Sequence, residues 1–310
     1  MASEGSTKAV ITAMFANLGI AVTKFVAAAL TGSSSMLAEG VHSLADTSNQ
    51  ALLLLGGKRA QRPATRQHPF GYGRERYVYA FIVSIVLFTL GGLFALYEAW
   101  HKWSHPEAIT NWHWVPIVVL LIAIVMESYA LRTAVVESNR VRGRQSWPEF
   151  VRHAKAPELP VILLEDLGAL LGLTFALAGV SLTLATGDGR WDAAGTAMIG
   201  VLLVIIAVVL AIEMKSLLVG EGATREHQLA IHRALSGDGI DAITNLRTLH
   251  LGPDELLVAA NVAVAPAATA EEVANAIDAA EDRIRTAVPI AKIIYIEPDL
   301  VGESNATHQA

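Results

Sequence analysis

Residues 193–217 read AAGTAMIGVLLVIIAVVLAIEMKSL, a stretch whose charged side chains, Glu213 and Lys215, come only near its end. A bilayer core about 30 Å thick is spanned by roughly 20 apolar residues in a helix, so this stretch is long enough to cross a membrane. Five earlier stretches also meet that length, at 8–30, 36–57, 77–100, 113–138 and 160–184. Together they predict an all-α polytopic membrane domain of six transmembrane helices.

The composition also favours a membrane protein. The chain has 310 residues, of which 53% are hydrophobic and 17% charged, and soluble domains usually carry more charge. With no cysteine in the sequence, disulfides and thiolate metal sites are excluded. The net charge of -6 argues against nucleic acid as a partner. The first apolar stretch is long and lacks a basic leader, so no cleavable signal peptide is expected.

Basic residues are concentrated in alternate loops, which predicts the orientation. One side has Lys58, Arg59, Arg62, Arg66, Arg74 and Arg76 after the second stretch, and Arg140, Arg142, Arg144, Arg152 and Lys155 after the fourth; the other side has Lys102 and Arg190. Cytoplasmic loops carry the excess of Lys and Arg, so both termini are expected on the cytoplasmic side. We expect a multi-pass protein of the cell inner membrane or plasma membrane. If the protein is in an organelle, "cytoplasmic" refers to the equivalent side of that membrane.

The composition changes after LLVGEGATRE, residues 217–226, where charges return and apolar runs shorten. Periodicity predicts a helix at 227–235, strands at 246–251 and 255–264, a helix at 269–288 that begins after Thr269, and a strand at 291–298. This helix-strand-strand-helix-strand order predicts a C-terminal cytoplasmic ferredoxin-like α+β domain. The expected domains are therefore 1–218 in the membrane, 219–300 in the cytoplasm and a disordered tail at 301–310. Residues 142–160 are too polar to span, and a short surface helix held by Trp147 and Phe150 is expected there, ending before Pro157.

Polar groups interrupt the second apolar stretch in EGVHSLADTSNQALLL, residues 39–54. On a helix, positions i, i+3, i+4 and i+7 share one face. That face carries Ser35, Glu39, His42, Asp46 and Asn49, hereafter the polar stripe. Charged groups inside a bilayer are costly and normally face a cavity or a partner. The spacing lets the imidazole of His42 and the carboxylate of Asp46 converge on one ion; the alternative is that the stripe makes hydrogen bonds between helices.

The fifth stretch supplies two acids in PVILLEDLGALLGL, residues 160–173. Glu165 shares a helix face with small residues, namely Gly168, Ala169, Gly172, Ala176 and Gly179. Such a face lets two helices approach closely, so Glu165 and Asp166 are expected at or beside a helix contact. The alternative is an acidic pair at the start of a helix, in the interfacial region of the bilayer.

One imidazole and two or three carboxylates suit Zn²⁺, which binds nitrogen and oxygen ligands at about 2.0–2.2 Å. A set made of oxygen atoms alone would suit Mn²⁺ or Mg²⁺ better, so His42 favours zinc. Histidine and carboxylates lose protons when they bind a metal. A divalent cation could therefore be exchanged for H⁺ at such a site.

Several segments together resemble the cation diffusion facilitator family: SSSMLAEGVHSLADTSNQ (33–50), HPFGYGRERYVYAF (68–81), WDAAGTAMIGVLL (191–203) and IIYIEP (293–298). The resemblance covers nearly the whole chain. It implies six transmembrane helices, a cytoplasmic ferredoxin-like domain, a homodimer and proton-coupled export of Zn²⁺ or a similar ion.

The zinc site of that family consists of HxxxD on the second helix and HxxxD on the fifth. His42 and Asp46 match the first motif and Asp166 matches the aspartate of the second, but Ile162 stands where its histidine would be. This variant resembles the zinc-transporter-nine-like branch. The fourth ligand stays open, with Glu165 the first candidate and Asn49 or Glu39 behind it. Metal sites found in the tail of some members carry over poorly, because Tyr295 replaces an expected histidine.

Three further polar residues lie within or directly before apolar stretches. Lys24 is expected to extend to the cytoplasmic interface, or to pair with an acid such as Glu127 or Glu98. Asn17 is expected to bridge helices or to lie beside the ion path. Asp192 either lines the exit or caps a helix N-terminus.

From these residues and the family resemblance we expect a dimeric transporter, not an enzyme, that moves Zn²⁺ out of the cytoplasm in exchange for H⁺ by alternating access. His42, Asp46, Asp166 and Glu165 are the predicted metal ligands. Mn²⁺, Fe²⁺ or Co²⁺ is the alternative substrate. An intramembrane metallohydrolase is disfavoured because the spans contain no HExxH motif, and a membrane metal sensor without transport is the remaining alternative.

Overall fold

The computed structural model describes residues 4–106, 112 and 114–300. The chain divides into two compact units, one made of the residues up to 58 together with 76–215, and one made of 59–75 together with the residues from 216 onward. The loop after the second long helix thus groups with the C-terminal residues. The tail expected to be disordered, 301–310, lies outside the described residues.

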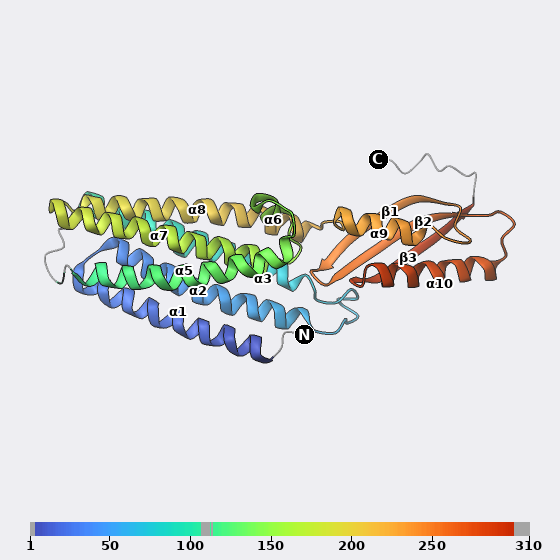
Figure 1. Ribbon diagram of the computed structural model, residues 1–310, viewed down its shortest axis with the longest axis horizontal. Helices are drawn as coiled ribbons and strands as arrows, with labels where there is room; N and C mark the ends of the chain where they lie inside the picture. The colour runs from blue at the N-terminus through green and yellow to red at the C-terminus, as the bar shows by residue number, and fades with distance from the viewer. Residues whose placement is uncertain (1–3, 107–111, 113, 301–310) are drawn as a thin grey trace. The chain divides into compact units, whose positions relative to one another are not determined.

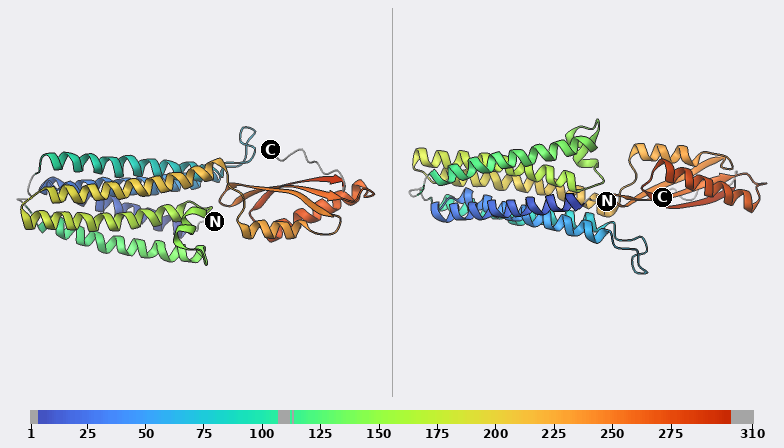
Figure 2. Two further views of the ribbon diagram at one scale, coloured as in Figure 1. Left: turned by 90° about the horizontal axis from the view of Figure 1, so that it is seen from above. Right: turned by 60° about the horizontal axis from the view of Figure 1, so that its bottom comes forward.

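The first unit is a bundle of long helices that run side by side (Figures 1 and 2). Its elements are α1 (Glu4–Thr31), α2 (Ser34–Ala60), α3 (Glu75–Val86), the π-helix η1 (Leu87–Leu93), α4 (Phe94–Ser104), α5 (Trp114–Arg142), α6 (Trp147–His153), α7 (Glu158–Thr186) and α8 (Arg190–Val219). The short helix α6 confirms the prediction for the polar segment. Ser146 and Glu149 cap it reciprocally, Phe150 is buried, and the helix ends before Pro157.

Four helices of the described chain are long and apolar enough to cross a membrane: 75–104, where α3, η1 and α4 are continuous, and then α5, α7 and α8. The helices α1 and α2 have similar lengths, 28 and 27 residues. They do not meet the same criterion in the described residues, where the apolar part of α1 is Asn17–Thr31. In α2 the polar stripe lowers the hydropathy. Four of the predicted spans are thus supported by composition and length, and a count of six remains a prediction.

The small-residue face of α7 makes a close helix contact, as predicted, and α8 is the partner at Gly168 and Gly179. A Cβ atom placed on Gly179 would lie 2.8 Å from the carbonyl oxygen of Trp191 and 3.3 Å from the Cα of Gly195. One placed on Gly168 would lie 2.7 Å from the Cδ1 of Ile206. Because small residues let the two backbones approach, α7 and α8 bring the apolar side chains of the bundle core together.

The turn between α1 and α2 is fixed by side chains from two other helices. Gly32 adopts a left-handed conformation with φ of 66°, and Lys102 of α4 donates a 2.8 Å hydrogen bond to its carbonyl oxygen. The carboxylate of Asp192, on α8, accepts hydrogen bonds from the Oγ of Ser33 at 2.9 Å and the backbone N–H of Ser34 at 2.6 Å. Asp192 therefore caps the N-terminus of α2 from a neighbouring helix and sets where α2 begins.

The second unit contains α9 (Arg225–Leu235), β1 (Ala242–Gly252), β2 (Glu255–Val264), α10 (Ala270–Ala287) and β3 (Ala291–Leu300), which is the predicted order. The sheet order is β1-β2-β3. β1 and β2 are antiparallel, with Leu249 opposite Leu257, and β2 and β3 are parallel, with Val258 opposite Ile294. A parallel pair needs a crossover connection, which α10 provides. Alternate residues of β2 are buried, and both helices lie on one face of the sheet (Figure 2). The ferredoxin-like classification remains a prediction.

Candidate metal site

The polar stripe of α2 faces the interior of the bundle. Four of its residues are fully buried, namely Ser35, Glu39, His42 and Asn49. The side chain of Asp46 is 14% exposed. The helix therefore turns its apolar positions outward and its ionisable groups toward other helices, which is the arrangement expected of charged groups in a bilayer.

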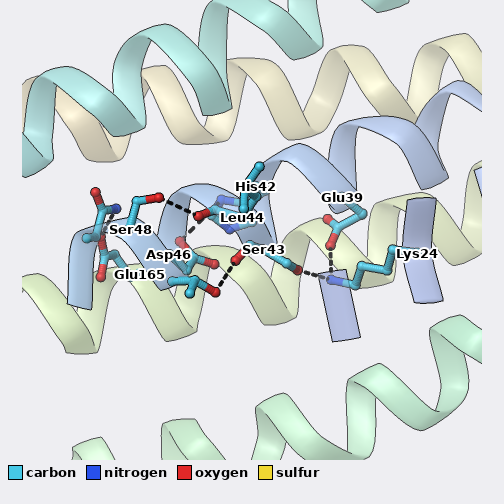
Figure 3. Close-up of polar contacts among 10 residues, drawn as sticks. Lys24, Glu39, His42, Ser43, Leu44, Asp46, Ser48 and Glu165 are labelled. Carbon is cyan, nitrogen blue, oxygen red and sulfur yellow. Dashed lines mark hydrogen bonds and ion pairs between the residues drawn. The ribbon is translucent and has the colours of Figure 1, made fainter. Parts of the chain in front are cut away.

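Lys24 is the first partner of the stripe. It is fully buried on α1, and its Nζ donates to Glu39 Oε2 at 2.9 Å and to Ser43 Oγ at 2.7 Å (Figure 3). The expectation that Lys24 extends to the interface is wrong. The alternative of an acidic partner is correct, but the acid is Glu39 instead of Glu127 or Glu98. A buried cation needs a close counter-charge, and the stripe presents Glu39 directly to α1.

His42 and Asp46 form the centre of the stripe. The Nδ1 of His42 lies 3.5 Å from Asp46 Oδ1, and Figure 3 shows the two side chains turned toward each other. Neither ring nitrogen of His42 has a hydrogen-bond partner among the described residues, and the same holds for Asp46 Oδ1. Buried polar atoms in folded proteins are nearly always satisfied. Atoms left without partners in this way can bind a ligand.

The helix α7 meets the stripe through Glu165. Its Oε1 accepts a 2.6 Å hydrogen bond from the Nδ2 of Asn49, and Glu165 is buried while Asp166 is half-buried. Asp46 interacts electrostatically with both Glu165 and Asp166. The second and fifth predicted spans are therefore neighbours at these residues. Within the described part of the chain, however, no three His, Asp or Glu side chains are grouped closely enough to hold a metal, so the ligand set remains a prediction.

A further acid, Glu127 on α5, was not among the predicted ligands. With Asn17 and Ile20 of α1 and with Ser43 and Asp46 of α2, it lines a narrow pocket. Asn17, predicted to bridge helices or to flank the path, is thus placed beside Asp46. The sequence does signal Glu127, since a carboxylate in the middle of an apolar stretch is costly unless it has a function. Asp192 lies apart from this group, at the start of α2, where it caps that helix.

Comparison with known proteins gives the family. The family model described as the cation efflux transmembrane domain matches residues 10–219. The chain is 31% identical to the proton-coupled zinc antiporter SLC30A9, mitochondrial, of Xenopus laevis over 266 residues, which is 84% of this chain and 47% of the relative. The human protein of the same name is 31% identical over 253 residues, 80% of this chain and 44% of the relative.

A plant relative is more distant. Metal tolerance protein C4 of Arabidopsis thaliana is 27% identical over 253 residues, 80% of this chain and 55% of the relative. The chain thus spans about half the length of the curated relatives it matches. The match to the family model covers the four helices that qualify as membrane spans. The chain therefore belongs to the cation efflux family, the cation diffusion facilitators, which are integral membrane transporters and not enzymes, and within it resembles the zinc-transporter-nine-like branch.

Proposed function

We propose that the chain is a proton-coupled antiporter that exports Zn²⁺ from the cytoplasm by alternating access. Family membership supports transport of a divalent metal, and the names of the SLC30A9 relatives support zinc and proton coupling. Mn²⁺, Fe²⁺ and Co²⁺ are the alternative substrates, because carboxylates bind these ions as well.

One observation carries the proposal. His42 and Asp46 are directed at each other inside the bundle, with ring nitrogens and a carboxylate oxygen that have no hydrogen-bond partner among the described residues. A purely structural stripe would be expected to satisfy these atoms by hydrogen bonds between helices. A divalent cation satisfies them when His42 is neutral and Asp46 is ionised.

Transport follows from the protonation chemistry of the ligands. In the state open to the cytoplasm, deprotonated His42, Asp46 and Asp166 bind the metal, with Glu165 as the first candidate from the sequence for a fourth ligand. When the helices move and the site opens to the other side, protons bind these groups and release the metal. The returning protonated site carries H⁺ inward, so that metal and proton fluxes are opposed.

The architecture of the proposal includes six spans within 1–218, a cytoplasmic domain at 219–300, a homodimer and both termini in the cytoplasm. The cell inner or plasma membrane is the predicted location. The SLC30A9 relatives are named as mitochondrial proteins, so a mitochondrial membrane is the alternative.

The test is metal-driven proton flux in proteoliposomes that contain the purified full chain, with a panel of divalent ions and with the pH gradient present or absent. Asp46→Ala and Asp166→Ala should each abolish the flux, because each removes a charged metal ligand. Asp188→Ala, in the exposed turn between α7 and α8, removes an acid of the same size and should transport normally. Full flux in both site variants would refute the proposal, and metal binding without any flux would identify a sensor instead.

A further inference from the structure

The second HxxxD motif has Ile162 in place of its histidine. Ile162 packs against an apolar cluster that contains Ala134, Phe150 and Leu163. The missing ligand must therefore come from elsewhere in the bundle. We infer that Glu127 of α5 supplies it, and that Glu127 with His42, Asp46 and Asp166 forms the metal site. This inference rests on the proposed function.

The three candidates for the fourth metal ligand that were named from the sequence already interact with other side chains. Glu39 is paired with the ammonium group of Lys24 at 2.9 Å. Asn49 and Glu165 are joined to each other by a 2.6 Å hydrogen bond. To bind the metal, Glu39 would have to abandon a buried lysine, and Glu165 would have to give up a short bond that satisfies a buried carboxylate. Both changes leave an uncompensated polar group in the core, which is costly.

Glu127 has no such partner. No hydrogen bond or ion pair joins its carboxylate to another residue of the described chain, and it lines the same narrow pocket as Asp46. Its charge interacts with that of Lys24 and with those of Asp46 and Asp166, the aspartates of the two motifs. Glu127 therefore lies near both halves of the predicted site, as Glu165 does, but Glu165 is already hydrogen-bonded to Asn49.

An independent observation points to a ligand at this place. His42 is fully buried, its ring is directed at Asp46, and neither of its nitrogens has a hydrogen-bond partner among the described residues. A cluster of acids that merely shared protons would not require an imidazole without hydrogen bonds. Among the described residues these groups are not close enough together to hold a metal, so the inferred site forms when the helices that carry them move together. Its donors would then be one nitrogen and several oxygens, a set that suits a divalent cation.

Replacement of an imidazole by a carboxylate changes the chemistry of the site. Two histidines and two aspartates form a borderline-soft set that suits zinc, whereas one histidine and three carboxylates form a harder set. Harder sets bind Mn²⁺ relatively better. The assignment of Glu127 therefore predicts weaker discrimination between Zn²⁺ and Mn²⁺ than a site with two histidines would give.

The experiment measures metal binding to the purified full chain and flux in proteoliposomes, with Zn²⁺ and Mn²⁺ as the probes. Glu127→Gln should weaken the binding of both metals by at least about tenfold, since it removes a charged ligand but keeps the size of the side chain. Glu127→His should restore Zn²⁺ binding and transport but not those of Mn²⁺. The matched control is Glu137→Gln, which removes an exposed acid from the same helix and should bind both metals normally.

Thermal unfolding separates a ligand from a structural residue. If Glu127 is a ligand, the same Zn²⁺ concentration should raise the melting temperature of the wild type more than that of Glu127→Gln, while the two melt alike without metal. A folded Glu127→Gln variant with unchanged metal affinity would refute the inference, and so would recovery of Mn²⁺ binding in Glu127→His. A wild type that transports no divalent ion would instead refute the proposed function.

Discussion

At the scale of single residues, the ion pair of Lys24 and Glu39 shows how the bundle tolerates a charge in its core. Both side chains are at most 1% exposed, and their charged atoms lie 2.9 Å apart. Removing two charges from water is unfavourable, and their attraction offsets this only while both partners are present. The pair joins α1 to α2 just before His42 and Asp46 of the polar stripe. Loss of this ion pair should therefore mainly lower the stability of the helical bundle.

Lys24→Met should lower the free energy of unfolding by about 3–5 kcal/mol, because it leaves the carboxylate of Glu39 buried without a counter-charge. Lys24→Met combined with Glu39→Gln should recover most of this loss, since no charge remains to be compensated. Thermal unfolding of the detergent-purified variants measures both effects. If the double variant is no more stable than the single one, the two residues do not act as a pair.

At the scale of secondary-structure elements, the contact between α7 and α8 depends on glycine. The Cβ of an alanine at position 179 would meet backbone atoms of Trp191 and Gly195, at 2.8 and 3.3 Å. Backbone atoms cannot rotate away as a side chain can, so the two helices would have to separate. Because α7 carries Glu165 and Asp166, such a separation would also move the acids of the site.

Gly179→Ala should destabilise the bundle by about 1–3 kcal/mol, the usual cost of overpacking. The control is Gly57→Ala, since a Cβ on Gly57 would meet nothing within 4 Å. There, the better helix propensity of alanine should leave stability unchanged or raise it by about 0.5–1 kcal/mol. Melting temperatures in detergent compare the two. Equal melting temperatures would mean that α7 and α8 do not need this close approach.

The N-terminus of α10 provides a pH-dependent element outside the membrane domain. The backbone N–H and the hydroxyl of Thr269 donate to Glu272 Oε2 at 2.8 and 2.9 Å, and these hydrogen bonds lower the pKa of Glu272. A pKa that is lower in the folded state means that the ionised carboxylate stabilises the helix. This stabilisation is present above the ordinary pKa of glutamate and is lost as the pH falls through the lowered value.

Hydrogen–deuterium exchange of the first turn of α10 in the full chain measures this effect. Relative to the last turn of the same helix, protection of the first turn should decrease as the pH falls below the ordinary glutamate range. Glu272→Gln, which keeps an acceptor oxygen but does not titrate, should show protection that is nearly independent of pH. The same pH dependence in both proteins would contradict a role for the Glu272 carboxylate.

At the scale of the whole molecule, the prediction to be tested is the orientation of the chain in the membrane. The chain contains no cysteine, so single cysteines can be introduced without a background. Gln145→Cys lies in the exposed segment between α5 and α6, and Asp188→Cys lies in the exposed turn between α7 and α8. The helix α7, which is long and apolar enough to cross a membrane, separates the two positions.

A membrane-impermeant maleimide should therefore label position 145 from the cytoplasmic side and position 188 from the opposite side. The physical reason is the excess of arginine and lysine in the loops on the side of position 145. Permeabilised membranes, in which both cysteines should react, control for accessibility. Labelling of both positions from one side would exclude α7 as a span, and labelling of each from the unexpected side would reverse the orientation.

The sequence by itself determined the features that depend on local periodicity. Apolar length predicted the long helices, a spacing of three and four residues placed His42 and Asp46 on one buried face, and alternation predicted the strands of the C-terminal unit in their correct order. These properties follow from hydrogen bonding and burial within a few turns of chain, so they can be recognised without knowledge of the neighbours.

The tertiary structure alone decided which polar groups meet. Lys24 pairs with Glu39 instead of Glu127. Asn49 donates a hydrogen bond to Glu165, and Asp192 of α8 caps the N-terminus of α2. Each partner lies on a different helix, and the relative rotation and displacement of two helices are set by the packing of all their side chains. A local pattern states which face of a helix is polar, but it does not state which polar face of which neighbour lies opposite.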